Sequence, residues 1–184
     1  MSFLSQEQEL NTVNILNSTI NEIIKDPNFR EGTAWIRRQF ISNEIIIRQG
    51  DISKSFFLIE EGVLRESIHV DIEERRNIQA GISDLIKGDF FGEISLFDSS
   101  ERINSITAVT NGSLIEINGK TLCEYLDNHQ NQGYLFFKQI VKTVIIRMTG
   151  GSHRIESLMA WGLKAHGIQN IYESINNIFG AIHY

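Results

Sequence analysis

Residues 88–109 read GDFFGEISLFDSSERINSITAV. In this stretch a glycine, Gly92, is followed directly by a carboxylate, Glu93, and an arginine, Arg102, comes nine residues after Glu93. Gly92 lets the backbone approach a ligand closely, and residues 93–97 suit a short helical turn whose free N–H groups attract an anion. Arg102 is a permanently charged, bidentate partner for a phosphate, and Glu93 can accept a hydrogen bond from a sugar hydroxyl. These features describe a nucleotide site, although the two charged residues also suit a simple surface ion pair.

Short β-branched and aromatic runs lie on both sides of this stretch, separated by turn-forming residues. Their close spacing predicts strands of an antiparallel meander or roll. The runs are AWIRRQF, NEIIIRQ, KSFFLIEEG, VLRESIHV, NIQAGI, SITAV and SLIEI. Asn111-Gly112 stands between the last two runs and is a two-residue hairpin signal, so we predict that these two strands pair with each other.

Both ends of the chain show helical spacing of apolar residues. Residues 5–25 predict an amphipathic helix that ends at Asp26-Pro27-Asn28. The period returns after Gly119, with interruptions at Gly150-Gly151-Ser152 and at Gly167. The chain therefore begins and ends in helices.

A strand-rich middle between helical ends predicts an α+β fold, and 184 residues suit one domain. We expect a helical lead over residues 1–30 and an antiparallel, jelly-roll-like β-roll over 31–118. Helices follow over 119–184 as part of the same domain.

The first long helix of the C-terminal part carries an apolar seam over residues 134–148. Its members step alternately by three and four residues: Tyr134, Phe137, Val141, Val144 and Met148. This heptad-like spacing favours a homodimer through the helix, and a wholly intramolecular core helix is the alternative.

The stretch 88–109 resembles the phosphate-binding cassette of the cyclic nucleotide-binding domain family. That family includes the catabolite activator protein and the regulatory subunits of cyclic-AMP-dependent protein kinase. Its cassette runs Phe-Gly-Glu-Leu-Ala-Leu, a short turn, and Arg-Ala-Ala-Thr-Val, and this chain has FGEISL at 91–96 and RINSI at 102–106. Upstream, Gly50-Asp51 and the run FLIEEGVL at 57–64 resemble the family's strand pair.

The resemblance implies a stand-alone regulatory domain that binds cAMP, or cGMP, and signals through movement of its C-terminal helices. It implies that Arg102 pairs with the cyclic phosphate, that Glu93 holds the ribose 2′-hydroxyl, and that Gly92 brings backbone amides to the ligand. The other candidate positions of the cassette are Ile94, Ser95, Ile103 and Asn104. Gly50 and Gly62 are implied to be fold residues, and the strand residues Ile78 and Ala80 are candidates for facing the base.

Three positions depart from the family's pattern. Ile103 and Asn104 replace small residues after the arginine, and Glu101 replaces a proline and adds a negative charge beside the phosphate. Because a threonine at the position of Ile103 favours guanine in the family, the isoleucine favours cAMP over cGMP. The alternative is a degenerate domain that serves as a protein-interaction or dimerisation module without a nucleotide.

The composition of the chain disfavours several classes of partner and of functional site. Lys+Arg 17 against Asp+Glu 23 gives a net charge of −6, and no DNA-reading helix follows the seam, so we expect no DNA partner. The single cysteine, Cys123, and the dispersed histidines disfavour disulfides, metal centres and catalysis, so we expect no enzyme and no cofactor. Without a leader or a spanning apolar stretch, we expect a cytoplasmic chain without a membrane partner, whose partners are a cyclic nucleotide and a protein effector.

Overall fold

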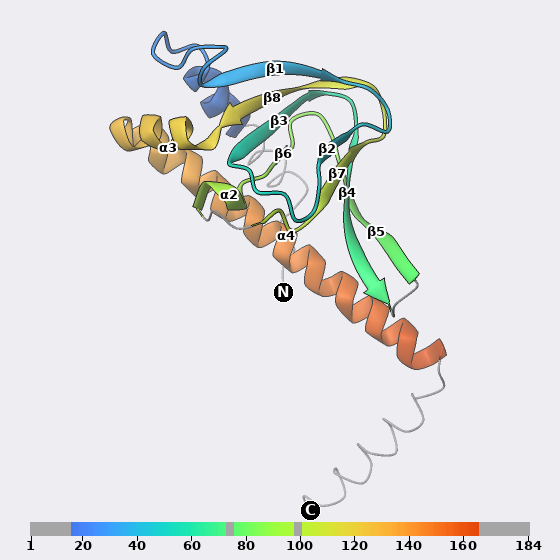
Figure 1. The fold of residues 1–184 in the computed structure, drawn as a ribbon. Helices are drawn as coiled ribbons and strands as arrows, with labels where there is room; N and C mark the ends of the chain where they lie inside the picture. Colours follow the sequence, from blue (N-terminus) through green and yellow to red (C-terminus); the bar gives the residue numbers. More distant parts are fainter. Residues whose placement is uncertain (1–15, 73–75, 98–100, 166–184) are drawn as a thin grey trace, which may run out of the picture. The chain divides into compact units, whose positions relative to one another are not determined.

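The computed structural model describes residues 16–72, 76–97 and 101–165. The chain divides into two compact units, residues 1–140 and 141–184, which are described separately. The first unit contains two four-stranded sheets, antiparallel throughout, together with short helices (Figure 1). The predicted α+β class and antiparallel roll are therefore confirmed.

Seven of the eight strands coincide with the predicted runs, and β6 was not predicted. The strands are β1 (Trp35–Phe40), β2 (Ile45–Ile47), β3 (Ser55–Glu61), β4 (Leu64–Ile72), β5 (Arg76–Leu85), β6 (Phe90–Phe91), β7 (Ser105–Ala108) and β8 (Gly112–Asn118). The helices are residues 16–23, α2 (Ile94–Phe97), α3 (Gly119–Asn128) and α4 (Gln130–Ala165).

The strands form two sheets, ordered β1-β8-β3-β6 and β2-β7-β4-β5. The segments that connect a strand of one sheet to a strand of the other lie at the two ends of the strands. Residues 41–44, 62–63, 86–89 and 109–111 make short connections at one end, and residues 48–54 and 92–104 make longer ones at the other. The candidate cassette therefore lies at the end with the longer connections, which we call the cassette end.

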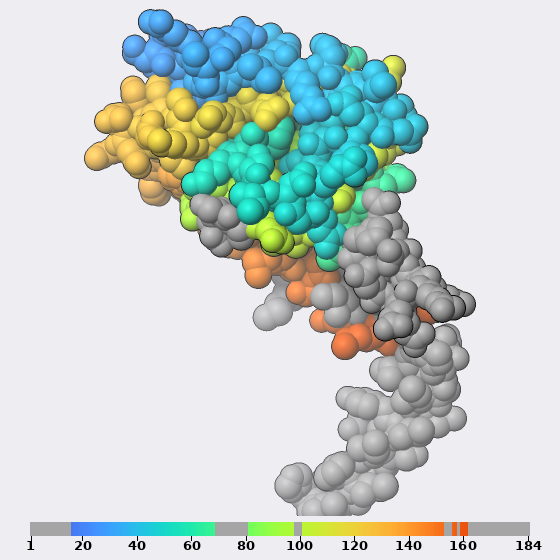
Figure 2. All heavy atoms as spheres, in the orientation of Figure 1, coloured from blue at the N-terminus to red at the C-terminus, as the bar shows by residue number. Residues whose placement is uncertain are grey.

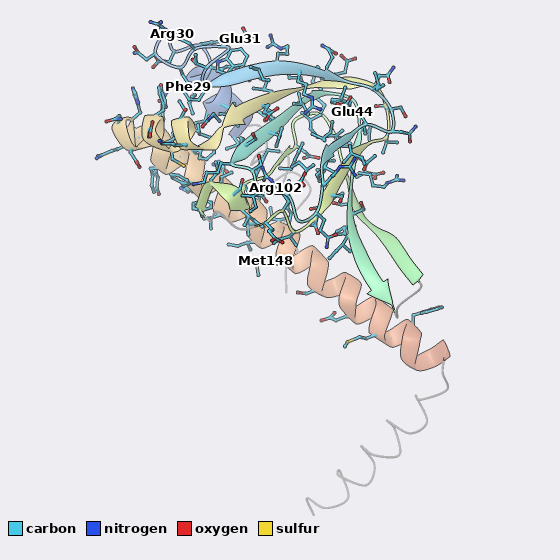
Figure 3. The ribbon with its side chains drawn as sticks, in the orientation of Figure 1. Phe29, Arg30, Glu31, Glu44, Arg102 and Met148 are labelled. Atoms are coloured by element: carbon cyan, nitrogen blue, oxygen red, sulfur yellow. The ribbon has the colours of Figure 1, made fainter. Side chains whose placement is uncertain are left out.

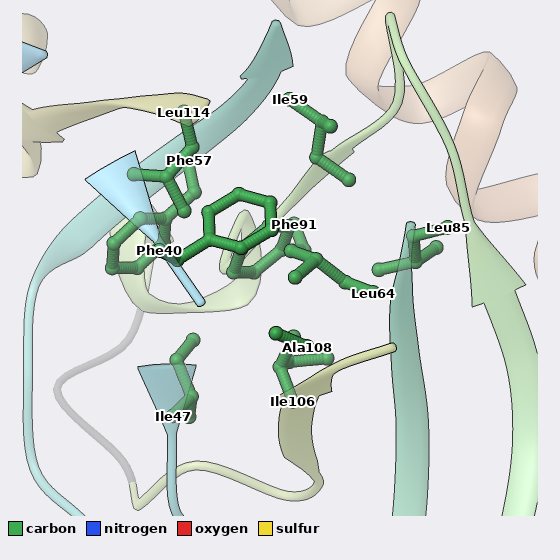
Figure 4. Close-up of a cluster of buried hydrophobic side chains, with 10 residues drawn as sticks. All are labelled: Phe40, Ile47, Phe57, Ile59, Leu64, Leu85, Phe91, Ile106, Ala108 and Leu114. Atoms are coloured by element: carbon green, nitrogen blue, oxygen red, sulfur yellow. The ribbon is translucent and has the colours of Figure 1, made fainter. Parts of the chain in front are cut away.

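The core lies between the two sheets, and each of the eight strands contributes a buried apolar side chain to it (Figure 4). The cluster consists of Phe40, Ile47, Phe57, Ile59, Leu64, Leu85, Phe91, Ile106, Ala108 and Leu114. β3 is apolar on both faces, because Phe56 packs on its other side against Phe136 of α4 with ring centroids 5.6 Å apart. This explains why the run FFLI lacks the alternation of a half-exposed strand.

The predicted hairpin at Asn111-Gly112 is wrong. β7 pairs with β2 and β4, whereas β8 pairs with β1 and β3, so the two strands belong to different sheets. The turn-forming pair serves a crossover instead: Asn111 Oδ1 accepts a hydrogen bond of 2.8 Å from the Ser42 amide. A Cβ on Gly112 would overlap the Glu61 carbonyl, so the close approach of two connections requires glycine there.

The helical residues 16–23 end before a turn at Asp26, as predicted, and the part of that helix expected over 5–15 lies outside the described residues. The turn packs against α3. The Tyr125 hydroxyl donates to Asp26 Oδ2 at 2.7 Å, and the Phe29 and Tyr125 rings meet edge to face at 5.2 Å. Figure 2 shows this N-terminal segment, in blue, lying beside α3, in yellow.

α4 runs without a break through Gly150-Gly151, so the predicted interruption there is wrong. The seam residues Tyr134, Val141 and Met148 are exposed, whereas Phe136 and Ile140 on another face are buried. The second predicted interruption of the helix, at Gly167, lies outside the described residues.

Candidate functional site

Arg102 is the centre of the cassette end and is only 7% exposed (Figure 3). Its Nη2 donates to the Ser55 carbonyl at 2.6 Å, and its Nη1 donates to the Ser95 hydroxyl at 3.0 Å and to the Gly92 carbonyl at 3.2 Å. A longer bond of 3.4 Å joins Nη2 to Ser53 Oγ. The guanidinium also lies over the ring of Phe57, 5.9 Å from its centroid.

Two properties of this arginine suit an anion site. All four of these hydrogen bonds end on uncharged oxygens, and Nε is buried without a hydrogen-bond partner among the described residues. Burial lowers the pKa of the Arg102 guanidinium, and the negative charge of Glu93 acts in the opposite direction. Arginine stays protonated in proteins, so the cassette end holds a buried positive charge.

Gly92 has a backbone φ of +81°, in the left-handed region that favours glycine. A Cβ at this position would lie 2.8 Å from Arg102 Nη1 and 2.8 Å from the Ser55 carbonyl oxygen. The residue therefore has to be glycine for two independent reasons: its backbone conformation and the space taken by the arginine.

Arg102 is also fixed through its backbone. Its amide donates to the Asp51 carbonyl and its own carbonyl accepts from the Gly50 amide, both at 2.8 Å. Gly50 has a φ of +87°, which turns the chain back at this point. The prediction that Gly50 serves the fold agrees with this place in the turn.

Glu93 lies beside Arg102 in the cassette and is 8% exposed. Because both charged side chains are buried, the alternative of a simple surface ion pair is wrong. Ser95 is also buried, and its hydroxyl donates to the Gly92 carbonyl at 2.7 Å. The structure thus brings together Gly92, Glu93, Ser95 and Arg102.

Three side chains of the candidate cassette are exposed to solvent. The side chains of Ile94 and Ile103 are 49% and 54% exposed, and Glu101 is exposed. Glu101 keeps its charge in solvent, where water screens it.

Asn104 lies in a polar cluster that the sequence did not reveal. Its Nδ2 donates to Glu66 Oε1 at 2.8 Å, and the Ser83 hydroxyl donates to Glu66 Oε2 at 2.9 Å. Ser53 and Ser55, which contact Arg102, were likewise not predicted. No local motif marks these residues, because each comes from a strand or loop far along the chain from the cassette.

The side chains of the predicted base-facing residues Ile78 and Ala80 lie outside what the structure describes. A cavity of about 690 Å³ lies on the outer face of the second sheet, lined by residues such as Arg65, Thr107 and Asp84, and its lining does not include Gly92, Glu93, Ser95 or Arg102. Within the described ranges, no group of metal-ligating side chains occurs, and no helix has the length and apolar character needed to span a membrane.

Comparisons with known proteins extend this picture. Residues 37–129 match the family model of the cyclic nucleotide-binding domain. The cAMP-dependent protein kinase regulatory subunit of Schizosaccharomyces pombe is 33% identical over 87 residues, which are 47% of this chain and 19% of that protein. Lysophospholipase NTE1 of Kluyveromyces lactis is 32% identical over 92 residues, which are 50% of this chain and 6% of that protein. The chain thus spans a fifth or less of the length of these relatives.

Solved structures share the fold. The catabolite activator protein of Thermus thermophilus has a TM-score of 0.57 at 18% identity, with 84% of this chain and 60% of that chain covered. A cyclic nucleotide-binding domain from Methylobacillus flagellatus has a TM-score of 0.61 at 17% identity, covering 79% and 83%. The matched family model includes both the cassette and the strands that hold it, so this chain belongs to the cyclic nucleotide-binding domain family.

Proposed function

We propose that this chain is a regulatory domain that binds a cyclic nucleotide, cAMP or cGMP, at the cassette end and does not transform it. The observation that carries the proposal is the buried Arg102. Its Nε has no hydrogen-bond partner within the described ranges, and the four hydrogen bonds named above all end on uncharged oxygens. A cyclic phosphate supplies the negative charge that this guanidinium favours. Glu93, which directly follows Gly92, supplies the acceptor for a ribose hydroxyl.

The test is a calorimetric titration of the chain with cAMP and with cGMP, accompanied by thermal unfolding. We expect saturable heat and a rise in melting temperature with at least one of the two nucleotides. No response to either nucleotide at millimolar concentration contradicts the proposal and favours a nucleotide-free interaction module.

Arg102→Ala identifies the phosphate partner. It removes a charge-assisted hydrogen-bond partner worth roughly 1.5–3 kcal/mol, so the affinity should fall by about 10- to 150-fold. The matched control is Arg37→Ala, which removes an exposed arginine that pairs with Glu60 on the surface at 2.7 Å. Arg102→Lys keeps the charge and serves if the alanine variant does not fold.

We further propose that binding is transmitted to the helices through α2. The Cys123 thiol of α3 contacts the Leu96 carbonyl at 3.8 Å, and the Phe97 ring lies 5.5 Å from the Phe137 ring of α4. A change in the cassette therefore reaches α3 and the start of α4 by direct contact. The exposed seam residues Tyr134, Val141 and Met148 support a homodimer through α4, with a protein effector as a further partner.

A further inference from the structure

The cluster of Glu66, Ser83 and Asn104 lies on the core-facing side of the second sheet. Glu66 of β4 stands opposite Ile106 of β7 and opposite Ser83 of β5. Residues opposite one another in a ladder point to the same face, and Ile106 is part of the buried core. Glu66 and Ser83 therefore continue the rows of core residues that begin with Leu64 and Leu85.

The cluster lies at the cassette end of these rows. β7 begins with Ser105 at the cassette end and finishes with Ala108 at the end with the short connections. Asn104 directly precedes β7 and therefore also lies at the cassette end. Asn104 is two residues from Arg102, so their Cα atoms are at most about 7 Å apart. Arg102 and this cluster therefore lie close together in the chain, at the same end of the strands.

The hydrogen bonds of the cluster leave acceptor atoms available to a ligand. Two donors, Ser83 Oγ and Asn104 Nδ2, point at the Glu66 carboxylate, one to each oxygen. Each carboxylate oxygen retains a further acceptor site, and Asn104 Oδ1 is buried without a hydrogen-bond partner in the described part of the chain. A ligand edge that satisfies this cluster must present hydrogen-bond donors, either N–H or O–H.

We propose that Glu66, supported by Asn104, determines base specificity and selects guanine over adenine; the inference rests on the proposed cyclic-nucleotide function. Guanine presents N1–H and the 2-amino group side by side, which match a carboxylate and a neighbouring amide oxygen. Adenine presents one amino group and the acceptor N1, which would face these acceptors without a hydrogen bond. This assignment opposes the expectation from Ile103, whose side chain is 54% exposed.

The experiment is a set of calorimetric titrations of the wild-type chain with cGMP, cAMP and cyclic IMP, which lacks the 2-amino group. We expect cGMP to bind at least about tenfold more tightly than cAMP, with cyclic IMP weaker than cGMP. Equal or tighter binding of cAMP overturns the inference and leaves the proposed function intact. Binding of none of the three overturns the proposed function, and the inference with it.

Glu66→Gln tests the carboxylate directly, because the amide replaces one acceptor by a donor at nearly the same size. We expect the ratio of cGMP to cAMP affinity to fall about tenfold or more, with the thermal unfolding curve still cooperative. The matched control is Asp84→Asn, the same change of chemistry on the same β4–β5 ladder, where Asp84 pairs with Arg65 at 2.7 Å. A ratio unchanged in Glu66→Gln overturns the inference, and if that variant does not fold, the cyclic IMP result on the wild type decides.

Discussion

Alanine at Gly92 and alanine at Gly50 form a matched pair of perturbations at the cassette end. Both glycines have nearly the same left-handed backbone, with φ of +81° and +87°. This conformation costs an L-residue about 1–2 kcal/mol, so both variants should lose this amount of unfolding free energy. The surroundings differ: a Cβ at Gly50 meets nothing within 4 Å, whereas one at Gly92 lies 2.8 Å from Arg102 Nη1 and 2.8 Å from the Ser55 carbonyl oxygen.

The steric part should therefore appear in Gly92→Ala alone. The Ser55 carbonyl belongs to β3 and cannot move far, so the overlap resembles overpacking, which costs typically 1–3 kcal/mol. We expect Gly92→Ala to lose about 2–5 kcal/mol in total, against about 1–2 kcal/mol for Gly50→Ala.

Equilibrium unfolding in urea measures this difference. With a slope near 2 kcal/mol per molar, an extra loss of about 2 kcal/mol moves the midpoint by about 1 M. Gly92→Ala should also weaken nucleotide binding, since Arg102 must move to make room. Equal midpoints for the two variants would refute the close packing of Gly92 against the arginine.

Three further predictions concern the helices. Phe136→Ala deletes a fully buried ring and should lower the unfolding free energy by about 3–5 kcal/mol, measured by urea unfolding. Tyr125→Phe removes a donor to Asp26, whose pKa is held below 3.8 by the Asn28 amide and the Tyr125 hydroxyl. A carboxyl with a lowered pKa stabilises the fold at higher pH and loses this contribution as the pH falls below 3.8, so the variant's stability should depend less on pH there in acid titrations. Val141→Glu places a charge on an exposed seam position and should convert a dimer into a monomer in sedimentation; a wild-type chain that stays monomeric at all concentrations contradicts the dimer.

Seven of the eight strands could be predicted in order, because apolar runs and turn residues are local signals, whereas the two-residue strand β6 (Phe90–Phe91) could not. The pairing of the last two strands could not. Asn111-Gly112 has the conformational freedom of a hairpin turn, but that freedom also suits a crossover, and only the partners of β7 and β8 distinguish the two. The same limit applies to Gly150-Gly151, because glycine weakens a helix without obliging it to end.

The cassette residues were predicted as a group because they lie close together in the sequence. Their supports were not: Ser55 lies 47 residues from Arg102, and Glu66 lies 38 residues from Asn104. A serine or glutamate in a strand looks like a solvent-facing residue unless the register is known. The burial of Glu93 and Arg102 could not be predicted from the sequence either, because two opposite charges in a polar segment occur at the protein surface as well as in a binding site.

The unequal lengths of the connections give the sandwich a mechanical polarity. Short connections restrain the separation of the two sheets at one end of the strands; these are residues 41–44, 62–63, 86–89 and 109–111. A longer connection can span a wider range of distances, so it restrains the separation of the sheets less at the other end. The Gly119 amide at the start of α3 is bonded to the Lys54 carbonyl in one of those longer connections, at 2.8 Å. A displacement of Lys54 would therefore be passed directly to the first residue of α3 through this hydrogen bond.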